Sequence, residues 1–244
     1  MAISVIFFIS NGSDERSPCK KPYVTFTFDD GYEDQYTAAL QIFEKHNVSA
    51  TLYVITGLVG SYFEGQKLMG WNQIYELQKN GLEIGSHTVN HKDLSRSDKD
   101  EIKEELATSK RTLIEKGFDA RTLSVPYGIY NENIEDIAKQ QYDSIRVSVW
   151  GPNNISELDE YRLKSFWMTN KTLLEDMKKW IDETKEKNYW TIITIHHVRE
   201  NKTREYTISP EDLEELIIYT KQKGIEIRKL SEVLDLGCNK RENR

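Results

Sequence analysis

The stretch Val24-Thr25-Phe26-Thr27-Phe28-Asp29-Asp30-Gly31 decides how this chain folds. Its first five residues are β-branched or aromatic and predict a buried strand, which ends in two adjacent carboxylates and a glycine. Paired aspartates are unfavourable inside an apolar core, because unpaired buried charge is costly and like charges repel. We therefore expect Asp29 and Asp30 on the rim of a sheet. Taken alone, the pair fits a helix-capping turn before a helix over 33–46 equally well.

A second polar cluster favours a functional site over a helix-capping turn. Gly85-Ser86-His87-Thr88-Val89-Asn90-His91 follows a short apolar segment over 82–84 and carries two imidazoles with the spacing H-x-x-x-H. With Asp30 they offer two nitrogens and one oxygen, which leaves open positions, as a hydrolytic metal site requires. We predict that Asp30, His87 and His91 bind a divalent metal ion, with zinc as the first choice. Asp29 is then free to accept a proton from the attacking water.

Short apolar runs alternate with amphipathic segments along the rest of the chain. This alternation predicts a parallel sheet, and seven or eight such units predict closure into a (β/α) barrel. In such a barrel the chemistry lies at the carboxyl ends of the strands, where both carboxylates and both histidines fall. The predicted strands are 24–28, 50–55, 82–84, 122–125, 144–149, 162–166, 190–196 and 225–227, and the predicted helices are 33–46, 71–80, 98–116, 131–141, 171–187 and 210–223.

Two further segments end predicted strands with polar groups. At Pro126-Tyr127-Gly128, the backbone N–H of Tyr127 could stabilise an oxyanion, although a Pro-x-Gly turn also simply ends a strand. The apolar run over 190–195 leads into His196 and His197. Because side chains alternate along a strand, only one of these histidines faces the barrel mouth in line with Thr194. We choose His196 as the general acid, with His197 as the alternative.

Two long segments, 57–70 and 150–161, are predicted as loops over the active face. Both carry aromatic residues, which fit either a carbohydrate platform or local packing. At 244 residues the chain is long enough for one large α/β domain, and no linker divides it. Its net charge of −7, with lysines scattered among glutamates, argues against a nucleic-acid partner.

The ordered motifs resemble the NodB-homology polysaccharide deacetylases, carbohydrate esterase family four. The resemblance covers roughly residues 23–234 and implies metal-dependent hydrolysis on an incomplete or distorted (β/α) barrel. The form Pro-Tyr-Gly-x-Tyr-Asn over 126–131 is similar to the branch that acts on poly-N-acetylglucosamine. The motifs that carry the resemblance are Thr27-Phe28-Asp29-Asp30-Gly31, Ser86-His87-Thr88-Val89-Asn90-His91, Pro126-Tyr127-Gly128 and the late strand histidine.

The chain departs from the family pattern at two places. Many members carry an arginine that holds the base carboxylate where Ser124 stands, and Arg146 on the next predicted strand is our candidate replacement. The tryptophan-containing fourth motif has no clean match, and Trp150 and Trp167 are the nearest residues.

The resemblance implies a metal-dependent hydrolase that removes N-acetyl groups from N-acetylhexosamine units of a polysaccharide or oligosaccharide. Asp29 would be the base, the Tyr127 amide would hold the oxyanion, and His196 would protonate the leaving amine. Two alternatives remain: a hydrolase of a small non-sugar amide on the same fold, and an inactive glycan-binding module. Retention of the complete polar set argues against the inactive module.

The chain ends bear on location. An apolar run over 3–9 is too short for a bilayer, which needs about 20 residues. We interpret 1–20 as an N-terminal tail or signal remnant, 21–236 as the deacetylase-like barrel and 237–244 as a C-terminal tail, and we favour an extracellular or cell-envelope location over the cytoplasm. Barrel closure should bring Cys19 and Cys238 to the amino-terminal face, where we favour two free thiols over a disulfide.

Overall fold

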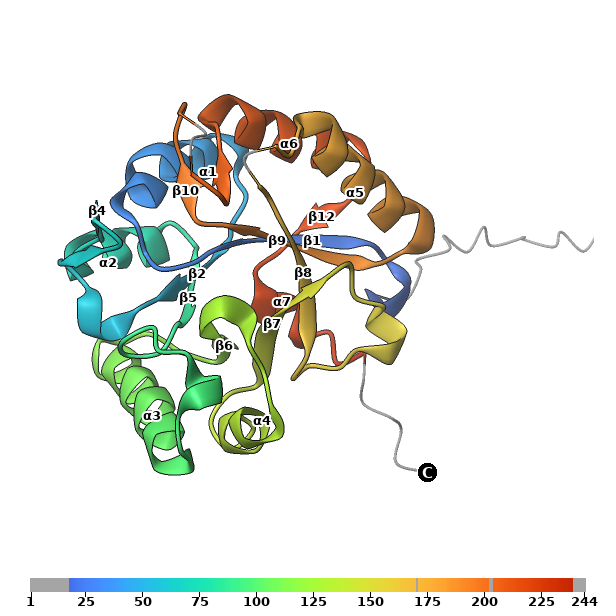
Figure 1. Cartoon of the computed structure of the whole chain (residues 1–244). Helices are drawn as coiled ribbons and strands as arrows, with labels where there is room; N and C mark the ends of the chain where they lie inside the picture. Colours follow the sequence, from blue (N-terminus) through green and yellow to red (C-terminus); the bar gives the residue numbers. More distant parts are fainter. Residues whose placement is uncertain (1–17, 170, 202–203, 239–244) are drawn as a thin grey trace, which may run out of the picture.

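A computed structural model describes residues 18–169, 171–201 and 204–238 of the chain (Figure 1). Within these residues seven parallel strands close into a barrel, because the last strand pairs with the first along its full length. An eighth short strand, β12 (Glu226–Ile227), pairs with the start of β1. The predicted distorted (β/α) barrel is confirmed. Around the barrel the strands are β1 (Tyr23–Phe28), β2 (Thr51–Val54), β5 (Glu83–Ser86), β6 (Thr122–Ser124), β7 (Ser144–Trp150), β8 (Leu163–Trp167) and β9 (Trp190–Ile195).

All the helices but the last lie outside the strands (Figure 1) and cover their apolar outer faces, whereas the last packs at the amino-terminal end of the barrel. Every predicted helix is present, but the first begins with a π-helical segment, η2 (Gln35–Ala39), before α1 (Leu40–His46). The sequence did not predict α7 or the strand pairs β3–β4 and β10–β11. The other helices are α2 (Trp71–Lys79), α3 (Lys99–Glu115), α4 (Glu132–Ala138), α5 (Leu174–Lys187), α6 (Pro210–Gln222) and α7 (Leu230–Leu234), and the short strands are β3 (Tyr62–Phe63), β4 (Gln66–Lys67), β10 (His197–Val198) and β11 (Thr207–Ile208).

Alternation along β1 explains why the barrel has a polar interior. Phe26 and Phe28 point outward and pack edge-on against Phe43 of α1. Thr25 and Thr27 make hydrogen bonds across the sheet, Thr25 with the Trp190 indole and Thr27 with Thr194. Small hydroxyl side chains in the interior leave room for larger polar groups above them, at the carboxyl ends of the strands.

The segment 150–161 does not lie over the active face, so that prediction is wrong. After β7 the chain turns back, and Asn153 pairs through its backbone with Trp190 at the first residue of β9. Ile155 then packs at the amino-terminal end of the barrel. The Trp150 ring packs on Trp180 of α5, which is the local-packing alternative. Among the described residues, the connection from β7 to β8 contains a 3₁₀ turn over 155–157 and no α-helix, and it covers the amino-terminal end of the barrel.

A disulfide joins Cys19 to Cys238, with their Cα atoms 5.2 Å apart. Both cysteines pack against an apolar cluster at the amino-terminal end of the barrel, which includes Tyr23 and Trp190. The predicted place is therefore confirmed, but the favoured reading of two free thiols is wrong. The sequence could not establish the approach of the two Cα atoms, because 219 residues separate them.

Among the described residues, no helix combines the length and the apolar character needed to cross a membrane. The elements from β1 to α7 fall inside the predicted range 21–236. Most of the predicted N-terminal tail and the last six residues of the predicted C-terminal tail lie outside the described residues.

Candidate active site

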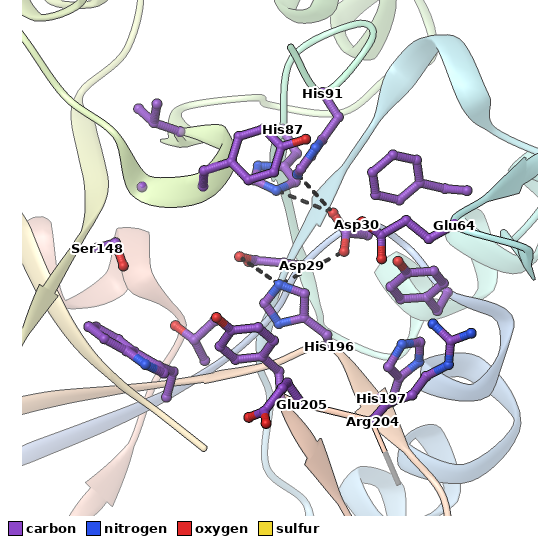
Figure 2. Close-up of a pocket in the computed structure, with 18 of the residues that line it drawn as sticks. Asp29, Asp30, Glu64, His87, His91, Ser148, His196, His197, Arg204 and Glu205 are labelled. Atoms are coloured by element: carbon purple, nitrogen blue, oxygen red, sulfur yellow. Dashed lines mark ion pairs between the residues drawn. The ribbon is translucent and has the colours of Figure 1, made fainter. Parts of the chain in front are cut away.

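The predicted polar residues meet in one pocket of about 290 Å³ at the carboxyl ends of the strands. Asp29 and Asp30 follow β1, His87 follows β5, and His196 follows β9. Figure 2 shows His87 and His91 on one side of Asp30, and His196 on the other. The ends of three strands, with the loop that follows β5, therefore bring together groups that lie far apart in the sequence.

Asp30, His87 and His91 form a buried group that could hold a metal ion, with their ligand atoms within 4.8 Å of one another. The Oδ1 atom of Asp30 lies 3.4 Å from the Nε2 atom of each histidine. The Nδ1 atom of His87 lies 2.7 Å from the carbonyl oxygen of Ser124, so it carries the proton and leaves Nε2 free to bind a cation. This donor set fits a divalent ion.

The charge states of this group also suit a cation. Burial would raise the pKa of Asp30, but contact with His87 and the nearby imidazoles hold it well below the ordinary value. Burial, reinforced by His87, lowers the pKa of His91 to about 4. Burial would lower the pKa of His87, but its contact with Asp30 and the charge of Asp29 raise it instead. Asp30 is thus ionised and His91 neutral, and a cation at His87 has to displace any proton held on Nε2.

The loop that carries both histidines is held from outside by Glu105 of α3. One oxygen of this buried carboxylate accepts hydrogen bonds from the backbone N–H groups of Val89 and Asn90, both at 2.9 Å, and the other accepts from the Asn90 amide at 2.7 Å. Thr88 and His91 adopt left-handed backbone conformations, with φ of 65° and 55°. Such strained positions persist only where the surroundings fix them.

Sequence reasoning missed Glu105. A signal was available, because Glu105 lies on the apolar stripe of α3 together with Ile102, Leu106 and Ser109. A carboxylate at helical spacing within a buried stripe needs partners there.

Asp29 lies beside Arg146, which the sequence analysis predicted as the replacement for the arginine that is missing at position 124. The Arg146 guanidinium donates to the Asp29 carboxylate and to the Ser124 hydroxyl, and all three side chains are buried. Below it the Tyr53 ring lies 5.6 Å from the guanidinium carbon. The arginine thus reaches from β7 across Ser124, because a small residue on β6 leaves the space.

The two late histidines point in different directions. The Nε2 atom of His196 lies 4.0 Å from Asp29 Oδ2 and 3.8 Å from Asp30 Oδ2. Burial lowers the pKa of His196. His197 instead pairs with Asp34, at 3.0 Å, and packs on the Tyr32 ring. Of the two histidines, His196 is therefore the one placed against both carboxylates.

The turn over 126–128 packs tightly against the site. Tyr127 has a left-handed backbone with φ of 58°, and its ring lies 4.8 Å from that of His91. A Cβ atom on Gly128 would come within 2.0 Å of the Ser148 Cβ, so only glycine fits there. This contact fixes the turn between His91 and β7.

Aromatic and charged side chains complete the pocket walls. The predicted loop over 57–70 reaches the active face as the β3–β4 hairpin and contributes Phe63 and Glu64. Trp167 lines the pocket, whereas Trp150 does not. Sequence reasoning missed the remaining wall residues, which are Tyr32, Arg204, Glu205 and Tyr206.

Comparison with known proteins finds several curated relatives that are named as deacetylases. The chain is 32% identical over 114 residues to a chitooligosaccharide deacetylase of Bradyrhizobium sp. (strain ANU 289), covering 46% of this chain and 48% of the relative. It is 29% identical over 134 residues to a poly-beta-1,6-N-acetyl-D-glucosamine N-deacetylase of Staphylococcus aureus (strain MRSA252), covering 49% and 45%. The chain thus spans about half the length of the curated relatives it matches.

A solved structure extends the match to most of the fold. The peptidoglycan N-acetylglucosamine deacetylase Bc1960 has a TM-score of 0.62 at 19% identity and covers 89% of this chain and 90% of its own. The family model described as polysaccharide deacetylase matches residues 16–143, which is just over half of the chain. The matched residues include Asp29, Asp30, His87, His91 and Tyr127. The chain therefore belongs to the polysaccharide deacetylase family.

Proposed function

We propose that this protein is a metal-dependent N-deacetylase that removes acetyl groups from N-acetylhexosamine units of a glycan. The observation that carries the proposal is the convergence of Asp29, Asp30, His87, His91 and His196 on one pocket. Relatives of the chain named as deacetylases of chitooligosaccharides and of poly-N-acetylglucosamine support an acetylated glycan as substrate.

Asp30, His87 and His91 would hold the ion, and their mixed nitrogen and oxygen donors fit zinc. A bound divalent ion supplies Lewis acidity, which polarises a carbonyl and lowers the pKa of water.

The remaining residues would move protons and stabilise charge. Asp29, held by Arg146, accepts the proton of the attacking water. The backbone N–H of Tyr127 donates to the oxyanion that forms on the amide carbonyl. His196, whose pKa is lowered by burial, takes up the proton that Asp29 has accepted, since its Nε2 atom lies 4.0 Å from Asp29 Oδ2, and passes it to the leaving amine.

The chain's aromatic pocket walls favour a sugar substrate over a small non-sugar amide. Tyr32, Phe63, Trp167 and Tyr206 surround a site that also carries charged groups at Glu64 and Arg204. Flat rings pack against the apolar faces of sugars, while polar groups bind their hydroxyls and amides. An inactive glycan-binding module would need neither an oriented base nor a buried set of metal-binding residues.

The experiment measures acetate release and metal content together. We expect the zinc-loaded protein to release acetate from N-acetylglucosamine oligomers and to lose that activity when a chelator removes the metal. Acetate release from small amides alone would favour the small-amide hydrolase. Glycan binding without acetate release, across a panel of acetylated glycans, would favour the binding module.

Two variants separate the roles of the adjacent carboxylates. We expect Asp29→Asn to keep the metal and lose on the order of 10² to 10⁴ in kcat, the usual worth of a positioned base. Asp30→Asn should weaken metal binding, because it removes the only anionic ligand. If Asp29→Asn emptied the site and Asp30→Asn left it full, the two roles would be reversed.

We also propose that the protein works outside the cytoplasm. The Cys19–Cys238 disulfide supports this, because such bonds persist mainly in oxidising compartments. Fractionation of the source cells, with thiols trapped at lysis, tests the proposal. Recovery of the protein in the cytoplasm with both cysteines reduced would contradict it.

A further inference from the structure

Gln35 connects the two strand ends that carry the proposed base and acid. Strands β1 and β9 pair as far as Phe28 and Ile195, and one more backbone bond runs from the Asp29 N–H to the Ile195 carbonyl at 3.0 Å. Beyond that point the side-chain amide of Gln35, and not a backbone hydrogen bond, connects the two strand ends. Its Nε2 atom lies 2.5 Å from the Asp29 carbonyl oxygen and 2.7 Å from that of His196.

A primary amide is well suited to this place. Two carbonyl oxygens on neighbouring strands need two N–H donors in one plane, which the amide NH₂ supplies. A hydroxyl has one proton to donate, and a carboxylate has none. Gln35 is the first residue of the π-helical segment η2, and such irregular turns are frequent at functional sites.

The oxygen atom of the amide indicates that packing alone does not explain why a glutamine stands at position 35. The residue is 2% exposed, and its Oε1 atom is buried with no hydrogen-bond partner among the described residues. An unsatisfied acceptor opposes folding, so an apolar side chain of similar size would serve stability as well. What an apolar side chain cannot do is hold the carbonyl groups of Asp29 and His196 together.

We infer that Gln35 is a positioning residue that fixes the separation of Asp29 and His196. The neighbouring Asp34 supports the same arrangement, because its carboxylate binds His197 and Arg199 just after β9. The side chains of Asp34 and Gln35, in the turn after β1, thus both bind the segment at the end of β9. Without the Gln35 amide, the two strand ends are free to separate and the base and acid lose their alignment. This inference rests on the proposed function.

The test replaces Gln35 by methionine, which has a similar length and no donor. We expect Gln35→Met to lower kcat on N-acetylglucosamine oligomers by about 10- to 100-fold, because misplacement of catalytic groups by about 1 Å has effects of that size. The KM should stay within about threefold and the zinc content should stay unchanged, because Gln35 does not itself line the pocket and its amide bonds backbone carbonyls, not the side chains of the proposed metal ligands. Gln41→Met, at an exposed position of α1, is the matched control and should match the wild type.

Rates are expressed per folded, zinc-loaded molecule, so a loss of stability cannot imitate the effect. Gln35→Glu provides a second variant of equal size, which has no N–H donor and at most one acid proton for the two carbonyl oxygens, and it should show the same loss. A normal kcat in either variant, even with a lowered Tm, would overturn the inference. If the zinc-loaded wild type releases no acetate from any glycan tested, the proposed function fails first, and this inference falls with it.

Discussion

At the scale of single residues, the arginine beside Asp29 stands at a different position, 146, from the one that the family resemblance implies. The family resemblance assigns an arginine to position 124, but this chain has serine there and places its arginine on β7 instead. The guanidinium still reaches Asp29, because residues 124 and 146 are paired in neighbouring strands. The guanidinium therefore lies beside the proposed base although it comes from a different strand than the family resemblance implies.

We expect Arg146→Met to lower kcat by roughly 10- to 100-fold, because Asp29 loses the group that orients it. Removing one partner of a buried ion pair should also lower the free energy of unfolding by about 3 to 5 kcal/mol. The double variant Ser124→Arg/Arg146→Ser should recover part of the rate. Steady-state kinetics with zinc analysis check both points, and Arg162→Met, at an exposed arginine, is the control. Equal rates in Arg146→Met and the wild type would remove Arg146 from the site.

The pKa of His87 gives a prediction for metal binding. Because the pKa of His87 is raised, its imidazole stays protonated to a higher pH than that of an ordinary histidine, and a protonated imidazole cannot bind a cation. Zinc affinity should therefore fall as the pH falls through this raised pKa, by about tenfold per pH unit for one proton. His91, with a pKa of about 4, stays neutral over this range. Competition titrations between about pH 5 and 8 measure the effect, and an affinity independent of pH would contradict it.

At the scale of elements, the site depends on a helix that does not reach it. The loop between β5 and α3 carries two left-handed residues, Thr88 and His91, and contributes two of the three proposed metal-binding side chains. Glu105 satisfies the backbone N–H groups of this loop from behind. We therefore expect helix α3 to affect metal binding through the conformation of this loop and not through direct contact.

Glu105→Leu should weaken zinc binding by about 10- to 100-fold, the usual effect of removing a group that orients metal ligands. The buried N–H groups of Val89 and Asn90 would lose their acceptor, and the loop would relax away from its strained conformation. Glu104→Leu, at an exposed position one residue earlier, should leave the affinity unchanged. Direct titration of zinc measures both variants. Equal affinities would show that the loop holds its shape without Glu105.

At the scale of the whole molecule, closure of the barrel places the candidate active site and the stabilising disulfide at opposite ends. The pocket lies at the carboxyl ends of the strands, and the Cys19–Cys238 disulfide lies with an apolar cluster at the amino-terminal end. The disulfide ties together residues just before β1 and just after α7. It therefore restrains nearly the whole chain while leaving the site untouched.

The variant Cys19→Ser/Cys238→Ser should lose about 2 to 4 kcal/mol of stability, because the disulfide restrains the unfolded chain. For a domain of this size that corresponds to a Tm lower by roughly 4 to 16 °C. The kcat should be unchanged at temperatures where both proteins are folded. Calorimetry and kinetics test this, and thiol titration of the denatured, unreduced wild type should find no free thiol. Two free thiols would show that the bond does not form.

The sequence by itself determined the strand and helix order and the polar residues at the strand ends. Asp29, Asp30, His87 and His91 were identifiable because carboxylates and imidazoles directly after apolar runs have few structural uses. Alternation along a strand also separated His196 from His197, because neighbouring side chains point in opposite directions. These are local properties, which a few consecutive residues fix.

Only the tertiary structure decided what depends on distant residues meeting. The helical spacing marks Glu105 as buried, but the groups that Glu105, Gln35 and Asp34 contact lie on other elements, so only the fold shows these contacts. The path of 150–161 under the barrel, and the pairing of Cys19 with Cys238, likewise follow from how the strands close. Closure of the barrel decides which strand ends lie on the same face, and closure depends on the pairing of strands from the whole chain.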